Sequence, residues 1–377
     1  APGMNVIFTC GGTGGHIYPA IAVANMLRQR KPEANILFIG AEDGMENKLV
    51  PLENFRLETL KISNFQRKLT PAGVWHNLTT LYNMNGSMRK VRRIIRDFRP
   101  DVIVGTGGYA SFPALKMGAK MGVPTAVHES NAVPGLTTRM VERLVDRVMV
   151  SFEDSRSQYS NPDRVIVTGT PVREEFIYTK KADARRQLGL DDRPLVVSYW
   201  GSLGAREMNK KIAEFMRLEC ADGEPFHHIH ATGSFGWRWM PDYVKELGTA
   251  LERHPHVEMR EFIYDMPLVM AAADLVICRA GAATISEAAA SGTPCIMVPS
   301  PNVTGNHQEK NARVLEAHGA AVVLREAECD GKTLYAAARG ILHDEAQRRE
   351  MTAAAHKMAV VDAAERIYNV TMELARG

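Results

Sequence analysis

A run of four glycines and one threonine, Gly11–Gly15, directly follows a short apolar segment early in the sequence. Glycine has no Cβ, so the backbone amides of such a turn can approach an anion closely. The NAD fingerprint is incomplete, because Ile17 stands where its third glycine belongs, and no Gly-Lys-Ser/Thr follows as in an ATP-binding P-loop. The turn therefore predicts phosphate binding by another route, with a purely structural tight turn as the alternative.

A histidine, His16, follows this turn at the expected start of a helix. Imidazole changes protonation near neutral pH and can serve as a general base. A lone histidine at a helix end often has no chemical role, but the adjacent glycine turn favours one. His16 is the first candidate catalytic residue.

A carboxylate, Glu287, ends the segment Thr284–Glu287 and precedes three alanines. A carboxylate can accept hydrogen bonds from two neighbouring ribose hydroxyls. The alternative is a capping or surface acid, which the apolar small-residue surroundings disfavour. Glu287 is therefore a candidate nucleotide-binding residue.

Three histidines, His227, His228 and His230, invite a metal interpretation. No acid or cysteine with ligand spacing accompanies them, so we interpret them as ordinary strand residues and expect no metal. The five cysteines stand far apart without a C-x-x-C pair, which indicates reduced thiols.

The chain has 377 residues, of which 45% are hydrophobic and 24% charged. This composition excludes a disordered, collagen-like or coiled-coil chain and gives room for two domains. Because 46 basic residues are balanced by 43 acidic ones, a nucleic-acid binder is disfavoured. No apolar run reaches the ~18 residues that span a bilayer.

Short β-rich runs alternate with helical stretches, which predicts βαβ units and parallel sheets. A helix is expected at 20–30 and another at 363–375. The expected strands lie at 6–10, 35–39, 102–104, 125–128 and 147–150 in the first half, and at 195–199, 227–231, 257–259, 275–278 and 295–298 in the second.

The two halves echo each other. The first strand of each half ends in a glycine turn, at 11–15 and 201–204, and a later strand ends in a small-residue turn, at 105–108 and 280–283. This predicts an α/β protein of two doubly wound, Rossmann-like domains that face a cleft, with ligands beyond the carboxyl ends of the strands. The boundary is expected near Gly169–Pro171.

The segment from Ile62 to Arg99 is strongly basic, with Asp97 its only acid. Trp75 and Leu78 begin an apolar helical stripe that continues through Leu81 and Tyr82. The stripe is either a core-facing helix with a solvated basic end or a surface that docks on anionic lipid. The basic residues are Arg67, Lys68, Arg89, Lys90, Arg92, Arg93, Arg96 and Arg99.

These motifs together resemble the bacterial MurG glycosyltransferases, which add N-acetylglucosamine to lipid I. The resemblance covers nearly the whole chain, and it rests on the order and spacing of the motifs rather than on any one of them. The motifs are GGTGGH at 11–16, Pro19, GGY at 107–109, HESN at 128–131, TPVR at 170–173, GSLGAR at 201–206, FIYDM at 262–266, CRAGAATISE at 278–287 and NHQEKNA at 306–312.

The resemblance implies the GT-B type of glycosyltransferase fold. An acceptor- and membrane-binding domain would span residues 4–171, with the last helix, 361–377, packed back on it. A domain that binds UDP-N-acetylglucosamine would span 172–360. The protein would be a peripheral membrane protein on the cytoplasmic side, with lipid I, UDP-N-acetylglucosamine and the anionic membrane surface as partners, no nucleic-acid partner, no cofactor and no metal.

The resemblance also assigns roles to residues. The backbone of Ile263 would meet uracil, Glu287 the ribose hydroxyls, Arg173 and Ser202 the diphosphate, and Gln308 the sugar. The segment around Glu287 would contribute Ala282, Ala283, Thr284, Ile285 and Ser286. From the first domain, Thr13, Gly14, Gly15 and Asn131 would reach the donor, and Gly12, Gly107, Gly108 and Tyr109 would hold the acceptor diphosphate.

Three positions depart from the family pattern. Leu203 stands where the family commonly has glutamine, so only backbone amides remain for contacts there. His307 stands in place of the first glutamine of a pair, so the sugar contact rests on Gln308, and Ser130 replaces a glutamine beside Asn131. None of them removes a residue that is assigned to chemistry.

The implied reaction is inverting: the muramoyl 4-hydroxyl attacks the anomeric carbon and UDP leaves from the opposite face. His16 is the first candidate base and Glu129 the second. Two alternatives stay open, a UDP-N-acetylglucosamine 2-epimerase and a non-catalytic, membrane-associated binding protein.

Overall fold

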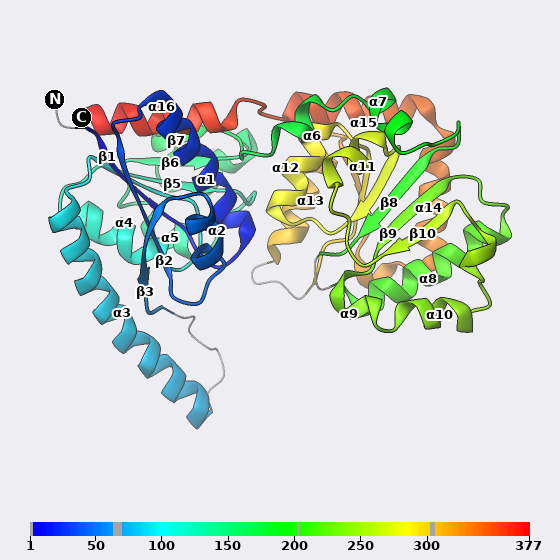
Figure 1. The fold of residues 1–377 in the computed structure, drawn as a ribbon, viewed down its shortest axis with the longest axis horizontal. Coiled ribbons are helices and arrows are strands. Elements are labelled where there is room, and N and C mark those ends of the chain that lie inside the picture. The colour runs from blue at the N-terminus through cyan, green and yellow to red at the C-terminus, as the bar shows by residue number, and fades with distance from the viewer. Residues whose placement is uncertain (1–2, 63–69, 202–203, 302–305) are drawn as a thin grey trace. The chain divides into compact units, whose positions relative to one another are not determined.

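The computed structural model describes residues 3–62, 70–201, 204–301 and 306–377. The chain divides into two compact units: unit 1 comprises residues 1–172 and 360–377, and unit 2 comprises residues 173–359. Each unit is a parallel sheet with helices on both faces (Figure 1), so the predicted α/β class with two Rossmann-like domains is confirmed.

Unit 1 contains a seven-stranded sheet of order β3-β2-β1-β4-β5-β6-β7. Its strands are β1 (Asn5–Thr9), β2 (Asn35–Ala41), β3 (Arg56–Leu60), β4 (Val102–Gly105), β5 (Thr125–Glu129), β6 (Arg147–Val150) and β7 (Val165–Val167). Its helices are α1 (Gly14–Arg30), α2 (Glu46–Leu52), α3 (Pro71–Phe98), α4 (Ser111–Lys120), α5 (Leu136–Val141) and α16 (Ala363–Arg376), with the 3-10 turns η1 (Glu153–Gln158) and η2 (Pro162–Arg164).

Unit 2 contains a six-stranded sheet of order β10-β9-β8-β11-β12-β13. Its strands are β8 (Leu195–Tyr199), β9 (His227–Ala231), β10 (Val257–Arg260), β11 (Leu275–Cys278), β12 (Cys295–Met297) and β13 (Ala321–Val323). Its helices are α6 (Glu174–Tyr178), α7 (Lys181–Gln187), α8 (Arg206–Ala221), α9 (Gly233–Trp237), α10 (Met240–Glu246), α11 (Met266–Ala272), α12 (Ala282–Ser291), α13 (His307–Ala317), α14 (Gly331–His343) and α15 (Glu345–Met358), with the 3-10 turns η3 (Leu251–Arg253) and η5 (Glu326–Glu328).

The strand orders explain why the small-residue turns come in pairs. In each sheet the chain starts in the middle, builds one side, and then crosses to the other, so β1 and β4 are neighbours in unit 1 and β8 and β11 are neighbours in unit 2. In doubly wound sheets, ligands bind at this switch point, beyond the carboxyl ends of the two strands. All four small-residue turns of the sequence follow one of these four strands.

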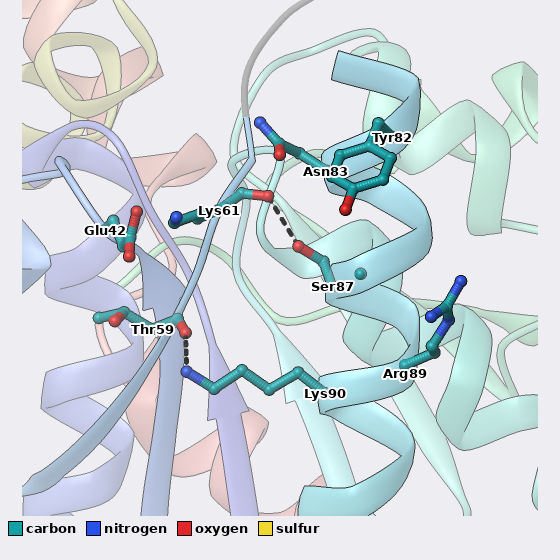
Figure 2. Close-up of a pocket in the computed structure, with 9 residues that line it drawn as sticks. Glu42, Thr59, Lys61, Tyr82, Asn83, Ser87, Arg89 and Lys90 are labelled. Carbon is teal, nitrogen blue, oxygen red and sulfur yellow. Dashed lines mark hydrogen bonds between the residues drawn. The ribbon is translucent and has the colours of Figure 1, made fainter. Parts of the chain in front are cut away.

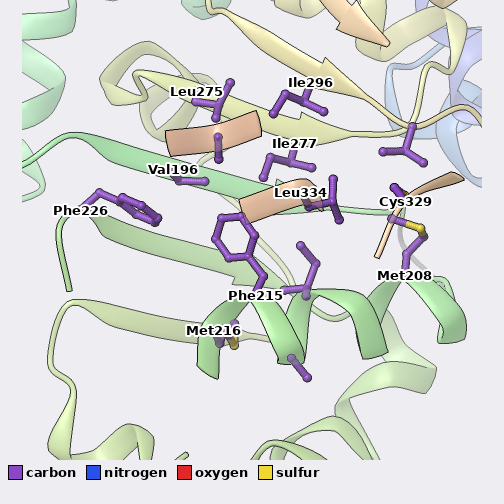
Figure 3. Close-up of a cluster of buried hydrophobic side chains, with 14 of the residues drawn as sticks. Val196, Met208, Phe215, Met216, Phe226, Leu275, Ile277, Ile296, Cys329 and Leu334 are labelled. Atoms are coloured by element: carbon purple, nitrogen blue, oxygen red, sulfur yellow. The ribbon is translucent and has the colours of Figure 1, made fainter. Parts of the chain in front are cut away.

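The apolar cores lie between the sheets and their helices. In unit 1, buried residues of β1 and β4 pack against α1 on one face, and α3 and α4 cover the other face. In unit 2, Phe215 and Met216 of α8 pack with Phe226, Val196 and other buried side chains over the sheet (Figure 3).

The last helix, α16, belongs to unit 1. It packs beside α1, where Arg30 forms an ion pair with Glu365 at 3.0 Å and its guanidinium lies over the ring of Tyr368. Its buried residues, among them Ile367, join the core of unit 1.

The helix expected at 20–30 begins six residues earlier, at Gly14. Two glycines and Pro19, which lies inside the helix, are weak helix formers, so the sequence pattern placed the start too late. Because α1 includes Gly14–His16, the histidine lies in the first helical turn.

Candidate active site

The two glycine turns of unit 1 pack directly on each other, backbone to backbone. The Gly11 amide donates to the Gly107 carbonyl at 3.1 Å, and a Cβ on Gly108 would overlap the Gly11 carbonyl. Gly12, Gly107 and Gly108 have φ values of +90°, +124° and +90°, which side chains rarely adopt. The structure therefore brings together the glycines that the resemblance assigned to the acceptor diphosphate.

Helix α1 begins beside these turns with its first amides uncapped. Thr13 is its N-cap in extended conformation, without a side-chain cap hydrogen bond, and the first turn contains no acid. A Cβ on Gly14 would meet nothing within 4 Å. A helix N-terminus of this kind favours an anion through its free amides and the helix dipole.

A carboxylate that the sequence reasoning missed, Glu46, lies under the first glycine turn. Glu46 is fully buried and accepts a hydrogen bond from the Gly12 amide at 3.1 Å. Cβ atoms on Gly11 or Gly40 would collide with its side chain. Burial raises the pKa of Glu46. The Gly12 amide is therefore used inside unit 1, and the open donors of this turn are those at the start of α1.

The imidazole of His16 has a defined orientation. Its Nδ1 lies 3.1 Å from the Gly11 carbonyl oxygen, which can only accept, so Nδ1 carries the proton and donates. The neutral ring then has its lone pair on Nε2. A Cβ on Gly107 would lie 2.6 Å from His16 Cδ2, so the missing side chain leaves room for the ring. The geometry suits a general base that acts through Nε2.

The second candidate base, Glu129, closes the loop that follows β5. Its Oε1 accepts from the Gly135 amide at 2.5 Å, and its Oε2 accepts from the backbone and side-chain amides of Asn131 at 3.3 and 3.4 Å. Glu129 is 6% exposed. Because its oxygens hold the loop, this carboxylate is a weaker candidate for the base than His16.

In unit 2, Glu287 lies one turn into α12 and is half-buried. Burial raises its pKa to about 7, and the nearby Arg173 guanidinium opposes this rise. Arg173 is the residue just before α6, which packs against α12, and its guanidinium lies 5.2 Å from the centre of the Phe176 ring. The structure thus brings together the two residues assigned to ribose and diphosphate.

The N-terminus of α12 resembles that of α1. Gly281 is its N-cap without a side-chain hydrogen bond, and its first turn contains no acid. Ala283 is exposed, and Ala282 and Thr284 are half-buried, whereas Ile285 is buried in the core. The first three therefore lie outside the core at the start of the helix, and Ile285 acts as a packing residue.

Two amide side chains of α13 hold the turn before α12. The Gln308 Oε1 accepts from the amides of Ser300 and Ala280, at 2.8 and 3.3 Å, and Asn311 donates to the Ala280 carbonyl at 3.0 Å. The oxygen of Gln308 is thereby committed to the backbone. Its Nε2 group is the part that can donate to a sugar hydroxyl.

The remaining predicted contacts divide into described and undescribed residues. Ile263 is half-buried in the loop after β10, and Tyr109 is 40% exposed just before α4. Ser202 and Leu203 lie outside the described residues. The contacts of Thr13, Gly15 and Asn131 with a donor stay predictions.

The three histidines of β9 bind protein groups. His227 lies 2.7 Å from Asp191, while His228 and His230 are buried and hydrogen-bonded to Ser198. Within the described ranges, no three His, Cys, Asp or Glu side chains form a group that could hold a metal ion.

The exposed side chains of helix α3 exclude one of the two interpretations of the basic segment. Trp75, Leu78 and Tyr82 are 72%, 57% and 78% exposed, and Val74 and Leu81 are exposed as well. The N-terminal half of α3 extends beyond the sheet of unit 1 (Figure 1). The stripe is therefore not core-facing. Arg67 and Lys68 lie outside the described residues, while Arg89, Arg92, Arg93, Arg96 and Arg99 are exposed.

A cavity of about 310 Å³ lies between the C-terminal half of α3 and the end of β3 (Figure 2). In it, Lys90 donates to the Thr59 carbonyl at 2.6 Å, and Ser87 donates to the Lys61 carbonyl at 2.7 Å. No residue of the predicted site lines this cavity. These hydrogen bonds tie α3 to β3, so Lys90 has a structural role within the basic segment.

No helix of the described ranges combines the length and the apolar character that crossing a bilayer requires.

Comparison with protein families gives matches in both units. The glycosyltransferase family 28 N-terminal domain matches residues 6–150, and the C-terminal domain of the same family matches residues 196–367.

Curated proteins match over their full length. A UDP-N-acetylglucosamine--N-acetylmuramyl-(pentapeptide) pyrophosphoryl-undecaprenol N-acetylglucosamine transferase of Acetivibrio thermocellus is 39% identical over 374 residues, which is 99% of this chain and 99% of that protein. A protein of the same name from Listeria monocytogenes is 36% identical over 374 residues, 99% of this chain and 100% of that protein.

Solved structures share the fold of this chain. The crystal structure of Acinetobacter baumannii MurG superposes with a TM-score of 0.78 at 25% identity and covers 98% of this chain and 99% of its own. The UDP-GlcNAc 2-epimerase of Neisseria meningitidis bound to UDP-GlcNAc reaches 0.65 at 14% identity, covers 98% of this chain and 100% of its own, and shares the fold alone.

Proposed function

The chain belongs to the MurG family of glycosyltransferases, and we propose that it transfers N-acetylglucosamine from UDP-N-acetylglucosamine to the 4-hydroxyl of the muramoyl sugar of lipid I. The product is lipid II, an intermediate of peptidoglycan synthesis. The observation that carries this function is the 39% identity over 99% of both chains to a protein named for the same transfer.

Unit 2 is the proposed donor-binding unit. The Glu287 carboxylate accepts hydrogen bonds from the ribose hydroxyls, and the adjacent Arg173 guanidinium pairs with the diphosphate. The uncapped N-terminus of α12 supplies backbone amides at the same switch point. Gln308 donates to a sugar hydroxyl through Nε2, because its oxygen already holds the backbone of Ser300.

Unit 1 is the proposed acceptor-binding unit. The acceptor diphosphate is held at the glycine turns and at the uncapped start of α1, where amides and the helix dipole favour negative charge. His16 is then beside the acceptor, and its Nε2 takes the proton of the attacking hydroxyl while the Gly11 carbonyl fixes the ring.

The transition state places positive charge on the donor sugar and growing negative charge on the leaving UDP. Preorganised donors aimed at such charge are commonly the largest contribution to catalysis. We assign this stabilisation to the α12 amides and Arg173. Attack on one face and departure from the other invert the anomeric configuration.

We further propose that unit 1 docks on the cytoplasmic face of the membrane through α3, with the apolar stripe of its N-terminal half and the arginines of its C-terminal half. An exposed apolar stripe next to exposed arginines suits an anionic lipid surface, since the apolar rings enter the interface and each cation near it adds about 1 kcal/mol. This surface would bring the enzyme to its lipid-linked acceptor.

A 2-epimerase is the second candidate from the sequence, but the epimerase structures share only the fold at 14% identity. Incubation of the full chain with radiolabelled UDP-N-acetylglucosamine and lipid I separates the two functions. Transfer of label to the lipid in the presence of acceptor supports the proposal. Conversion of the donor sugar without acceptor, and no labelled lipid with it, would establish the epimerase.

A further inference from the structure

Five buried polar side chains form a row across the core of unit 2, between the sheet and α8. Ser198 comes from β8, His228 and His230 from β9, and Asn209 and Glu219 from α8; all five are 0% exposed. Ser198 is paired with His230 in the ladder, and strand alternation puts His228 on the same face. We name these five residues the buried polar chain. Its neighbours include Phe215, which lies edge-on to His228 among the apolar residues of Figure 3.

The hydrogen bonds of the buried polar chain are continuous. The distances are 2.6 Å from Glu219 Oε1 to His228 Nδ1, 2.7 Å from His228 Nε2 to Ser198 Oγ, 2.7 Å from Ser198 Oγ to His230 Nδ1, and 2.9 Å from His230 Nε2 to Asn209 Oδ1.

Asn209, at one end of the buried polar chain, fixes the direction of every hydrogen bond in it. Asn209 Nδ2 donates to the Thr232 carbonyl at 3.0 Å, so Asn209 Oδ1 must accept from His230 Nε2. The Nδ1 of His230 then accepts from the Ser198 hydroxyl, and the Ser198 oxygen accepts from His228 Nε2.

The hydrogen bond at the other end of the buried polar chain, between Glu219 and His228, takes its direction from the same reasoning. With Nε2 of His228 donating, Nδ1 of the neutral ring accepts, so Glu219 donates a carboxyl proton to it. Burial agrees with this assignment, since it raises the pKa of Glu219 well above its usual value and lowers the pKa of His228 to about 3. Neutral, aligned hydrogen bonds polarise one another and hold each group in a single orientation.

The buried polar chain ends beside Gly204, which precedes α8. A Cβ on Gly204 would overlap the Thr232 carbonyl and lie 3.3 Å from Asn209 Nδ2, and a Cβ on Gly236 would overlap the same amide. Gly204 has a φ of +84°. Gly204 therefore packs against the end of β9 at the carbonyl that the Asn209 amide binds.

A Glu–His–Ser row also has the composition of a nucleophilic triad. Here Ser198 donates to His230 and is fully buried, so no substrate reaches its oxygen. Burying five polar groups, where apolar ones would pack as well, gives stability little but imposes one arrangement.

We propose that the buried polar chain positions Gly204, at the switch point beyond β8, for the diphosphate of the sugar-nucleotide donor. Ser198, His228 and Glu219 are then positioning residues for donor binding, although none of them contacts Gly204. This inference rests on the proposed donor-binding role of unit 2 and names the residues that set its affinity.

The test uses the full chain with Ser198→Ala, which interrupts the row at its centre. We expect KM for UDP-N-acetylglucosamine and Kd for UDP to rise about threefold to tenfold, as for loss of one hydrogen bond, with kcat and the acceptor KM within twofold of wild type. The control is Ile341→Val, a buried core substitution on α14 that lowers stability without touching the row.

Two variants of Glu219, at one end of the buried polar chain, provide a test with a conservative substitution. Glu219→Gln donates an amide proton to His228 as the carboxyl does, so donor KM should stay at the wild-type value. Glu219→Ala removes that donor and should raise donor KM in the direction of Ser198→Ala. This pair keeps the test decisive if Ser198→Ala does not fold.

Two results would overturn the inference. In the first, Ser198→Ala and Glu219→Ala lower Tm as Ile341→Val does and leave donor KM unchanged, which makes the row merely structural. In the second, the wild-type chain neither binds UDP nor transfers N-acetylglucosamine, which overturns the proposed function and this inference with it.

Discussion

The turns at the switch points of the two units are held in place by different kinds of contact. In unit 1 the turns after β1 and β4 are held backbone to backbone, with the Gly11 amide on the Gly107 carbonyl. In unit 2 the turn after β11 is held by side-chain amides of α13, with Gln308 and Asn311 on Ala280, and the Asn209 amide of α8 donates to the Thr232 carbonyl beside Gly204.

This difference suits two different tasks. Backbone packing in unit 1 needs glycines and leaves the His16 ring room, oriented by one carbonyl, beside an anion site that suits a base acting on an acceptor. Side-chain clamps in unit 2 fix the start of α12 and leave Glu287 half-buried near Arg173, which suits recognition of a nucleotide. We therefore assign the general base to unit 1, and donor affinity together with stabilisation of the leaving UDP to unit 2.

The largest expected effect is that of His16→Ala on turnover. Loss of the base should lower kcat about 10²- to 10⁴-fold, because a sugar hydroxyl is a weak acid that needs help to lose its proton. Steady-state kinetics with saturating donor and acceptor measure it. A loss below tenfold would move the base to Glu129 or water and remove the chemistry from His16.

Charge reversal on α3 should have the next largest effect, and on membrane binding alone. Replacing Arg89, Arg92 and Arg93 with glutamate removes about 3 kcal/mol of attraction and adds repulsion. We expect flotation with anionic vesicles to be lost at low salt and UDP binding to be unchanged. Lys90 stays in place because it ties α3 to β3. Flotation equal to wild type would show that α3 is not the docking surface.

A smaller effect concerns the pH dependence of donor binding in unit 2. Burial raises the pKa of Glu287 to about 7, so the free protein holds a proton there that the unfolded chain gives up near its ordinary pKa. Stability from this residue is greatest at acid pH and is lost as pH rises through about 7. The carboxylate accepts from ribose, so UDP-N-acetylglucosamine should bind more tightly at pH 8 than at pH 6.

The matched variant is Glu287→Gln, which should bind the donor more weakly than wild type at pH 8 and lose this pH trend. Calorimetry at the two pH values gives both quantities. An unchanged trend in the variant would assign the titration to another group.

The smallest expected effect is that of a chelator. Because the leaving diphosphate is assigned to α12 amides and Arg173, EDTA should change kcat by less than twofold. Complete loss of transfer that magnesium restores would contradict this assignment and give unit 2 a different means of stabilising charge.

The sequence predicted the central strands well and missed β3, β7 and β13. These lie at sheet edges and are short or half-exposed, so they carry little of the continuous apolar pattern of buried parallel strands. The paired small-residue turns could be predicted because the two turns at each switch point follow neighbouring strands, where the backbone must pass close to other groups.

The supporting residues were harder to predict. Glu46 accepts a hydrogen bond from Gly12, which precedes it by 34 positions, and no local sequence motif predicts such a contact. Whether the apolar stripe of α3 faces the core or solvent could not be predicted from its periodicity, because a buried and an exposed helix face have the same spacing of apolar residues. The sequence offered Glu129 as a second candidate base, but its hydrogen bonds to the loop that follows β5 could not be foreseen from the sequence.

The division of labour between the units is tested most directly by donor affinity in two variants. UDP is titrated by calorimetry at pH 8 into wild type, His16→Ala and Glu287→Ala. We expect a Kd within twofold of wild type for His16→Ala and one about tenfold or more weaker for Glu287→Ala, since a hydrogen bond to a charged group contributes about 1.5 to 3 kcal/mol. A large loss of UDP affinity in His16→Ala, with none in Glu287→Ala, would contradict it.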